Sequence, residues 1–313
     1  MASLPEPGPG QVLVENRFLS VDPYMRGRMY RGSSYSTAWQ IGAPLDGDAV
    51  GVVSKSRDPG LPEGTWVRSE LGMRDRFVAS TGLEPLQDPP AGFDHGAFLG
   101  VLGPTGLTAF LGVVRILRPE PGEWVLVSSA AGSVGSVAGQ IARLKGARVI
   151  GSTGSETKAR AVVGRYGFDA SFSYRDRDFG EALDELAPDG IDCFFDNVGG
   201  EQLEATLDRM RVGGRIAKCG AISSYNSSRR SPGPSNLHHL FAKRLTVKGY
   251  LVSDHRDGRA EIQRMMRGWI ESGDLRADQT VYEGLASVPM AFADLFAGAN
   301  LGKSIIALEE SPA

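Results

Sequence analysis

Cysteine and histidine are scarce in this chain of 313 residues, which has two cysteines, Cys193 and Cys219, and four histidines. Two cysteines form neither a disulfide framework nor a structural zinc site with four cysteine ligands. A catalytic zinc site needs a cysteine or histidine ligand early in the first domain, and no cysteine precedes Cys193. We therefore expect no metal site, and a protein that works in a reducing compartment, the cytoplasm.

Long apolar runs and an excess of one charge are also missing. No stretch approaches the ~18 apolar residues that a membrane span requires, and residues 1–5 lack the basic and apolar pattern of a secretory signal. The 34 Lys and Arg residues nearly balance the 37 Asp and Glu residues, which argues against binding to nucleic acid or a membrane surface. Glycine, in contrast, is abundant at 41 residues, which is typical of tight turns and of loops that bind phosphate.

The pattern of apolar residues changes near residue 100. Up to residue 99 the chain has short apolar or alternating runs, such as 11–16 and 48–53, separated by proline and glycine clusters, which predicts a mostly β domain. Beyond residue 100, apolar runs alternate with helical patterns, starting with a strand over 124–129. This alternation predicts βαβ units and a doubly wound parallel sheet, so the expected fold class is α/β. A helix over 289–296 and a strand over 304–308 close the chain.

Residues 130–135, Ala-Ala-Gly-Ser-Val-Gly, form a glycine-rich turn between a predicted strand and a predicted helix. The turn matches G-x-G-x-x-G with Ala130 in place of the first glycine. Gly132 lets the backbone approach a pyrophosphate, and Gly135 lets the helix pack close to the strand. A tight turn without a ligand is the alternative, but the surrounding βα alternation favours a dinucleotide site at this helix N-terminus.

The end of the second predicted strand indicates which dinucleotide binds. An NAD site has an acidic residue there, whereas this chain has Gly-Ser-Thr-Gly-Ser-Glu-Thr-Lys over residues 151–158. A charge-assisted bond from Lys158 to a phosphate is worth roughly 1.5–3 kcal/mol, which favours NADP by about one to two powers of ten. Glu156 could serve NAD instead, but an acid at a helix start also complements the helix dipole. We expect NADP(H).

Without a metal, the substrate must be polarised by a hydroxyl, a backbone N–H or the cofactor. Tyr225 is a candidate, because it follows the predicted strand over 214–217 through the segment 219–224. Ligands of Rossmann folds bind at the carboxyl ends of parallel strands. A tyrosine that only packs a loop is the alternative interpretation.

Six segments carry a resemblance to a known family: 19–29 (LSVDPYMRGRM), 102–109, 130–140, 195–200 (FDNVGG), 219–226 (CGAISSYN) and 300–303 (NLGK). In these the chain resembles the zinc-independent medium-chain dehydrogenases/reductases, in the branch of NADP-dependent alkenal, leukotriene and prostaglandin reductases. The resemblance implies a homodimer and a GroES-like catalytic β domain built from residues 1–99 and 276–313 around a Rossmann domain of residues 100–275. Family members carry a further segment before residues 5–10, so we expect a shortened β domain with an open sheet edge.

The resemblance also implies an activity and a set of site residues. The activity is the NADPH-dependent reduction of the C=C bond of α,β-unsaturated ketones or aldehydes, with hydride added to the β-carbon and the enolate stabilised by Tyr225. A quinone reductase and a non-catalytic NADPH-binding protein stay open as alternatives. Tyr24 and Tyr35 would line the substrate pocket, and Lys158 would bind the 2′-phosphate. The full set of cofactor contacts would be Thr105, Gly132, Ser133, Val134, Gly135, Ser155, Lys158, Tyr174, Asn197, Cys219, Gly220, Ala221, Ile222, Ser223, Tyr225, Tyr250 and Asn300.

Overall fold

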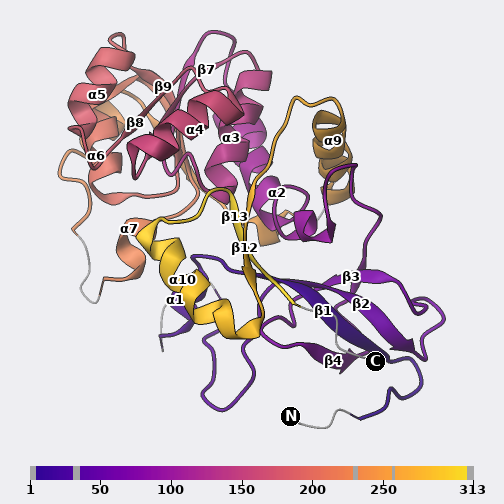
Figure 1. Ribbon diagram of the computed structural model, residues 1–313. Coiled ribbons are helices and arrows are strands. Elements are labelled where there is room, and N and C mark those ends of the chain that lie inside the picture. Colours follow the sequence, from indigo (N-terminus) through magenta and orange to yellow (C-terminus); the bar gives the residue numbers. More distant parts are fainter. Residues whose placement is uncertain (1–4, 31–35, 228–231, 256–257, 309–313) are drawn as a thin grey trace. The chain divides into compact units, whose positions relative to one another are not determined.

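The computed structural model describes residues 5–30, 36–227, 232–255 and 258–308 (Figure 1). The chain divides into two compact units. Unit 1 combines the two ends of the chain, Met1–Gly100 and Gln279–Ala313, and unit 2 is the segment between them, Val101–Asp278. Each unit is built around a sheet of its own.

Unit 1 contains a seven-stranded sheet in the order β12-β13-β1-β2-β3-β5, with β4 paired to β1. Neighbouring strands are antiparallel except for β12 and β13. Phe18 in β1 lies opposite Ala307 in β13, so both ends of the chain contribute to one sheet. The strands are β1 (Val12–Ser20), β2 (Ala49–Ser56), β3 (Trp66–Ser69), β4 (Arg76–Ala79), β5 (Glu84–Pro85), β12 (Gln279–Glu283) and β13 (Lys303–Ala307).

Two apolar clusters hold unit 1 together. Strand β1 alternates between buried and partly exposed residues, as expected for an antiparallel sheet with one face on a core. Its buried residues Val12 and Val14 pack in a cluster with Val53, Val67 and Phe77. The second cluster joins the end of β1 to α10 through Leu19, Val21, Ala49, Ala291 and Ile306. The helices of this unit are α1 (Met25–Arg28) and α10 (Val288–Ala297), with 3₁₀ turns η1 (His95–Leu99) and η4 (Leu285–Ser287).

Unit 2 contains six parallel strands in the order β11-β10-β9-β6-β7-β8. The chain starts at β6, runs outward to β8, then crosses back to β9 and runs outward to β11. This is the strand order of a Rossmann fold, with its switch point between β6 and β9. The predicted α/β fold class, a doubly wound parallel sheet with a separate mostly β part, is therefore confirmed. The strands are β6 (Trp124–Val127), β7 (Arg148–Thr153), β8 (Ala170–Ser173), β9 (Ile191–Asp196), β10 (Met210–Lys218) and β11 (Thr246–Gly249).

Helices cover this parallel sheet, whose inner strands are buried on both faces. Leu126, Ile150, Phe194 and Ile216 come from four neighbouring strands and are wholly buried in one cluster. No helix in the described part of the chain is long and apolar enough to cross a membrane. The helices are α2 (Pro104–Phe110), α3 (Ser133–Leu144), α4 (Glu156–Tyr166), α5 (Phe179–Leu186), α6 (Gly200–Arg209), α7 (Ile222–Tyr225), α8 (His239–Ala242) and α9 (Arg259–Glu271), with the π-helical turn η2 (Leu111–Leu117) and the 3₁₀ turn η3 (Val252–Asp254).

Three features of unit 2 differ from the sequence-based expectation. The apolar residues of 246–252 predict a strand over this whole range, but β11 ends at Gly249, because its partner β10 ends at Lys218, directly opposite. Helix α9 was missed, although its buried residues Ile262, Met266 and Ile270 recur every four positions. The π-helical turn η2 was also missed. Gly112 in this turn has no side chain because a Cβ would lie 2.4 Å from both the Phe195 ring and the Tyr250 hydroxyl.

Candidate functional site

The predicted cofactor residues of unit 2 follow the ends of its six parallel strands. Parallel strands all end on the same side of a sheet, so these residues share one side, which we call the carboxyl edge. In strand order from β6 to β11, the segments beyond the strand ends hold residues 132–135, Ser155 with Lys158, Tyr174, Asn197, residues 219–225 and Tyr250. Thr105 joins them from α2, because its hydroxyl accepts a hydrogen bond from the Ser133 hydroxyl over 2.8 Å. The fold thus gathers residues that are far apart in the sequence.

The turn after β6 forms a cradle at the start of α3. Ser129 has a left-handed backbone with φ of 52°, and its carbonyl oxygen faces the first turn of the helix. A Cβ on Gly135 would lie 2.3 Å from this oxygen, and a Cβ on Gly132 would lie 3.1 Å from the Ser129 hydroxyl. The N–H groups of residues 133–135 have no carbonyl partner within the helix, because they belong to its first turn. The turn therefore presents backbone donors at the positive end of a helix, where anions bind.

Two cations approach the turn between β7 and α4. The Ser155 hydroxyl caps α4 by accepting a hydrogen bond from the Lys158 N–H over 3.3 Å. A Cβ on Gly154 would lie 3.5 Å from the Tyr174 hydroxyl and 3.9 Å from the guanidinium carbon of Arg175. Burial, and then the charge of Arg175, lower the pKa of Lys158. No carboxylate in the described residues forms an ion pair with Lys158 or with Arg175. Two neighbouring cations without an anion are suited to a phosphate group.

Sequence reasoning missed Arg175. It comes directly after Tyr174 at the end of β8, where the residues up to Arg177 form a turn. A basic residue directly beyond β8 was a visible signal, because the end of β8 lies beside the end of β7, where the 2′-phosphate was expected.

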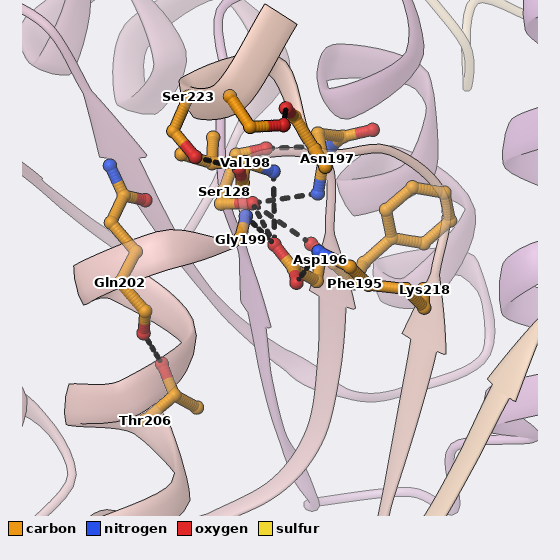
Figure 2. A network of polar contacts seen from close by, with 12 residues as sticks. Ser128, Phe195, Asp196, Asn197, Val198, Gly199, Gln202, Thr206, Lys218 and Ser223 are labelled. Carbon is orange, nitrogen blue, oxygen red and sulfur yellow. Dashed lines mark hydrogen bonds and ion pairs between the residues drawn. The ribbon is translucent and has the colours of Figure 1, made fainter. Parts of the chain in front are cut away.

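The turn beyond β9 is fixed by hydrogen bonds to its neighbours on both sides (Figure 2). The Asn197 N–H donates to the Ser128 hydroxyl over 2.9 Å, and its side-chain amide donates to the Ser128 carbonyl over 2.7 Å. The carbonyl of Asn197 accepts from the Ile222 N–H over 3.2 Å. The carbonyl of Val198 accepts from both the N–H and the hydroxyl of Ser223, over 3.3 and 2.6 Å. The segments after β6, β9 and β10 therefore form one connected surface.

Tyr225 ends the short helix α7 beyond β10 and is half-buried. Its hydroxyl oxygen accepts a hydrogen bond from the Ala221 N–H over 3.3 Å. The hydroxyl hydrogen has no acceptor among the residues that the structure describes. Burial, with smaller contributions from Cys219 and Asp196, raises the pKa of Tyr225. The side chain therefore stays protonated at neutral pH and can donate a hydrogen bond to a ligand.

Two other residues at this edge are less available for chemistry. Burial raises the pKa of the Cys219 thiol to about 12, so a reactive thiolate is not formed at neutral pH. The Tyr250 hydroxyl donates to the carbonyl of Thr108 over 2.9 Å, which occupies its hydrogen. Within the described ranges, no group of three or more His, Cys, Asp or Glu side chains is arranged to hold a metal ion.

Three predicted site residues do not belong to unit 2. Asn300 is buried in unit 1, where its side-chain amide donates to the Gly302 carbonyl over 3.0 Å. Tyr24 precedes α1 in the same unit, and burial together with the nearby Asp22 raises the pKa of its hydroxyl. Tyr35 lies outside the described residues. The roles of these three side chains stay predictions.

A buried ion pair at the carboxyl edge was also missed from the sequence. Asp196, the last residue of β9, has no exposed surface, and its carboxylate lies 2.5 Å from the ammonium group of Lys218 at the end of β10 (Figure 2). An acid at a strand end was a visible signal, but nothing in the sequence alone pairs it with Lys218.

Two family models match the chain. Residues 1–85 match the family model described as the N-terminal domain of oxidoreductase. Residues 133–268 match the model described as zinc-binding dehydrogenase. The second match begins at Ser133, the first residue of α3.

The chain is also similar along nearly its whole length to individual proteins. It is 37% identical to 2-alkenal reductase (NADP(+)-dependent) of Nicotiana tabacum, with 96% of this chain and 88% of the relative covered. It is 38% identical to prostaglandin reductase 1 of Mus musculus, with 97% and 91% covered. The solved structure of CurA in complex with NADPH from Vibrio vulnificus matches with a TM-score of 0.94 and 33% identity, with 99% and 94% covered.

Proposed function

The chain belongs to the zinc-independent medium-chain dehydrogenases/reductases, in the alkenal and prostaglandin reductase branch, and we propose from this premise that it reduces the C=C bond of α,β-unsaturated ketones and aldehydes. The protein is an NADP-dependent oxidoreductase. The observation that carries the proposal is the Tyr225 hydroxyl at the carboxyl edge, whose hydrogen has no acceptor among the described residues.

The residues of unit 2 fit NADP(H) along the carboxyl edge. In a Rossmann fold the two halves of the sheet take the two nucleotides, and the pyrophosphate lies at the first helix N-terminus. The cradle before α3 would hold the pyrophosphate, since the close packing of Gly132 and Gly135 against Ser129 places the free N–H groups of the first helical turn directly after β6. Lys158, Arg175 and the Tyr174 hydroxyl would hold the 2′-phosphate of the adenosine half. Asn197 and residues 219–225, beyond β9 and β10, would then border the nicotinamide half.

When bound, NADPH supplies the hydride that adds to the β-carbon of the substrate. The electron pair of the C=C bond then moves to the carbonyl oxygen and gives an enolate. Tyr225 stabilises this oxygen by donating a hydrogen bond, because its raised pKa keeps the proton on the hydroxyl. A proton from solvent on the α-carbon completes the saturated ketone or aldehyde. These steps need neither a metal nor a strong base.

The substitution Tyr225→Phe tests this assignment. We expect turnover to fall by about one to three powers of ten, since a single hydrogen bond to a developing oxyanion is worth that much. NADPH affinity should change by less than about threefold, because the ring stays. Tyr166→Phe is a matched control. It also removes a buried tyrosine hydroxyl, which donates to Asp278 over 2.7 Å, but Tyr166 is the last residue of α4 and so lies away from the carboxyl edge, where α4 begins. Unchanged turnover in Tyr225→Phe would remove this residue from the mechanism.

A substrate panel tests the reaction class. NADPH oxidation is followed with straight-chain 2-alkenals, enones of different length and a quinone at equal NADPH concentration. Faster turnover of the alkenals and enones supports the proposal, whereas turnover of the quinone alone would favour a quinone reductase. Binding of NADPH with no oxidation across the panel would indicate a non-catalytic protein.

We also expect a homodimer that pairs through β11. This strand forms ladder hydrogen bonds with β10, and no strand in the described residues pairs with its outer side. Such an unpaired strand attracts a second strand unless it is protected. Val247 in β11 is 46% exposed, and nearby Phe241 and Leu237 are 77% and 48% exposed. A second copy would cover these apolar side chains and extend the sheet.

A further inference from the structure

Asp196 makes polar contacts with three segments of the carboxyl edge, although the proposed reaction does not use it. One carboxylate oxygen accepts hydrogen bonds from the N–H groups of Val198 and Gly199, over 2.9 and 2.8 Å. The other oxygen lies 2.5 Å from the ammonium nitrogen of Lys218 (Figure 2). The carboxylate is wholly buried, whereas the Lys218 side chain is 27% exposed. The side chain of Asp196 therefore fixes the turn beyond β9 and the end of β10 at once.

The main chain of Asp196 adds a third connection. Its carbonyl oxygen accepts hydrogen bonds from the N–H groups of Cys219 and Gly220, over 2.9 and 3.1 Å. These two residues begin the turn that leads from β10 into α7. The side chain of Asp196 also lies 3.4 Å from the Ser128 hydroxyl, in the turn beyond β6. One residue thus ties three neighbouring turns of the carboxyl edge together.

These contacts continue to Tyr225 through the backbone. The Asp196 carboxylate orients the peptide groups of the turn that follows it, and the carbonyls of Asn197 and Val198 in this turn accept from the N–H groups of Ile222 and Ser223. These acceptors fix the first turn of α7, which ends at Tyr225. A change at Asp196 therefore reaches both Asn197 and the Tyr225 hydroxyl, although Asp196 touches neither side chain in the described contacts.

The charge of Lys218 neutralises the buried carboxylate of Asp196. Of the described residues, Lys218 supplies the one ion pair of Asp196. A Cβ on Gly199 would lie 2.8 Å from the Lys218 ammonium nitrogen, so glycine at this position leaves room for the pair. Removing the cation would leave a negative charge, poorly screened by water, close to Tyr225. Such a charge opposes the formation of an enolate beside the same tyrosine.

We propose that Asp196 and Lys218 form a positioning pair, in which Asp196 holds Asn197 and Tyr225 in place and Lys218 neutralises the carboxylate that does so. The inference rests on the proposed function, because it assigns the pair a role in enolate stabilisation at the same site. Neither residue is a catalytic residue. Buried residues of this kind act by locking the geometry of the groups that touch the substrate.

The test compares three variants, Lys218→Met, Asp196→Asn and the double variant, in single-turnover hydride transfer from NADPH to a straight-chain 2-alkenal. We expect Lys218→Met to slow hydride transfer about 10- to 100-fold, because the carboxylate is left without its cation. Asp196→Asn keeps an oxygen for the two N–H donors and should be slowed about 3- to 10-fold. The double variant should be about tenfold faster than Lys218→Met, because it restores neutrality. The KM for NADPH should change less than about threefold in all three.

A matched control separates this role from stability alone. Arg215 lies in the same strand β10, and its guanidinium group pairs with Glu123 at the opposite end of the sheet. Arg215→Met breaks a partly buried ion pair of the same sheet, so we expect a comparable drop in thermal unfolding temperature with hydride transfer unchanged. If Arg215→Met slowed hydride transfer as much as Lys218→Met, the positioning role would be wrong.

The proposal is also overturned if the double variant is no faster than Lys218→Met, or if all three variants stay within about twofold of the wild type. Failure of the proposed function looks different, since the wild type itself would then reduce no alkenal or enone. In that case the fluorescence of bound NADPH replaces turnover as the readout. If the pair orders the nicotinamide side, its loss in Lys218→Met lowers this fluorescence without a large change in NADPH affinity. Unaltered fluorescence in Lys218→Met refutes the positioning role of the pair.

Discussion

The two cations at the β7–α4 turn predict how the protein distinguishes NADPH from NADH. Lys158 and Arg175 are close enough for the charge of Arg175 to lower the pKa of Lys158, and no described carboxylate neutralises either of them. A 2′-phosphate would therefore gain two charge-assisted hydrogen bonds without displacing an existing ion pair. NADH has no such phosphate, so neither cation contributes to its binding.

The expected magnitude differs between the two side chains. A charge-assisted bond from half-buried Lys158 is worth roughly 1.5–3 kcal/mol, so Lys158→Ala should lower kcat/KM for NADPH about 10- to 100-fold. Arg175 is exposed, and water screens its charge more strongly, so Arg175→Gln should cost about tenfold or less. In both variants we expect kcat/KM for NADH to stay within about twofold.

The assay measures initial rates with each cofactor at a fixed, saturating 2-alkenal concentration. Arg177→Gln is the control for Arg175, because Arg177 lies two residues further on and pairs with Glu185 instead. The pH dependence of NADPH affinity gives a second test, because the direction of its shift can be predicted. Losing the Arg175 charge raises the pKa of Lys158 toward its ordinary value, so the loss of NADPH affinity at alkaline pH should move to higher pH in Arg175→Gln. An unchanged ratio of NADPH to NADH efficiency in Lys158→Ala would refute the reasoning.

Three further expectations concern packing, assembly and pH. Gly135→Ala places a Cβ 2.3 Å from a backbone oxygen, so it should lower the thermal unfolding temperature and weaken NADPH binding, whereas Gly164→Ala, with nothing within 4 Å, should do neither. Val247→Lys should convert a dimer into a monomer in light scattering, and an unchanged mass would exclude β11 as the interface. Burial lowers the pKa of His95, which stacks on Trp66 at 3.8 Å, so protonation is harder in the folded state and stability should fall as pH drops below about 6.5. This slope should be smaller in His95→Phe, as measured by urea unfolding between about pH 7 and pH 5.5.

Local patterns were sufficient to predict the βα alternation of unit 2 from β6 to β10, although not helix α9. Buried strands such as β6 and β9 are short, continuous apolar runs, and the helices between them have a 3.6-residue period, so each element can be recognised without its neighbours. Right-handed βαβ connections leave few ways to wind such a sheet, but the order of its strands was not predicted and comes from the structure. Strands β4, β5 and β12 were not predicted, since short strands lack a period long enough to stand out from the loops around them.

Candidate site residues could be selected from the sequence where they depend on position along the chain, and not where they depend on the register of two strands. Residues 132–135, Lys158 and Tyr225 follow strand ends, so the rule that ligands bind at the carboxyl ends of parallel strands was enough to select them. The pairing of Asp196 with Lys218 depends instead on the alignment of β9 with β10, in which these two residues lie opposite each other. Several alignments would bury the apolar residues of both strands equally well, because strands buried on both faces carry no alternation that fixes the register. The residues that hold a site in place are therefore harder to find from sequence than those that form it, and the three-variant comparison at Asp196 and Lys218 measures how much such a residue contributes to catalysis.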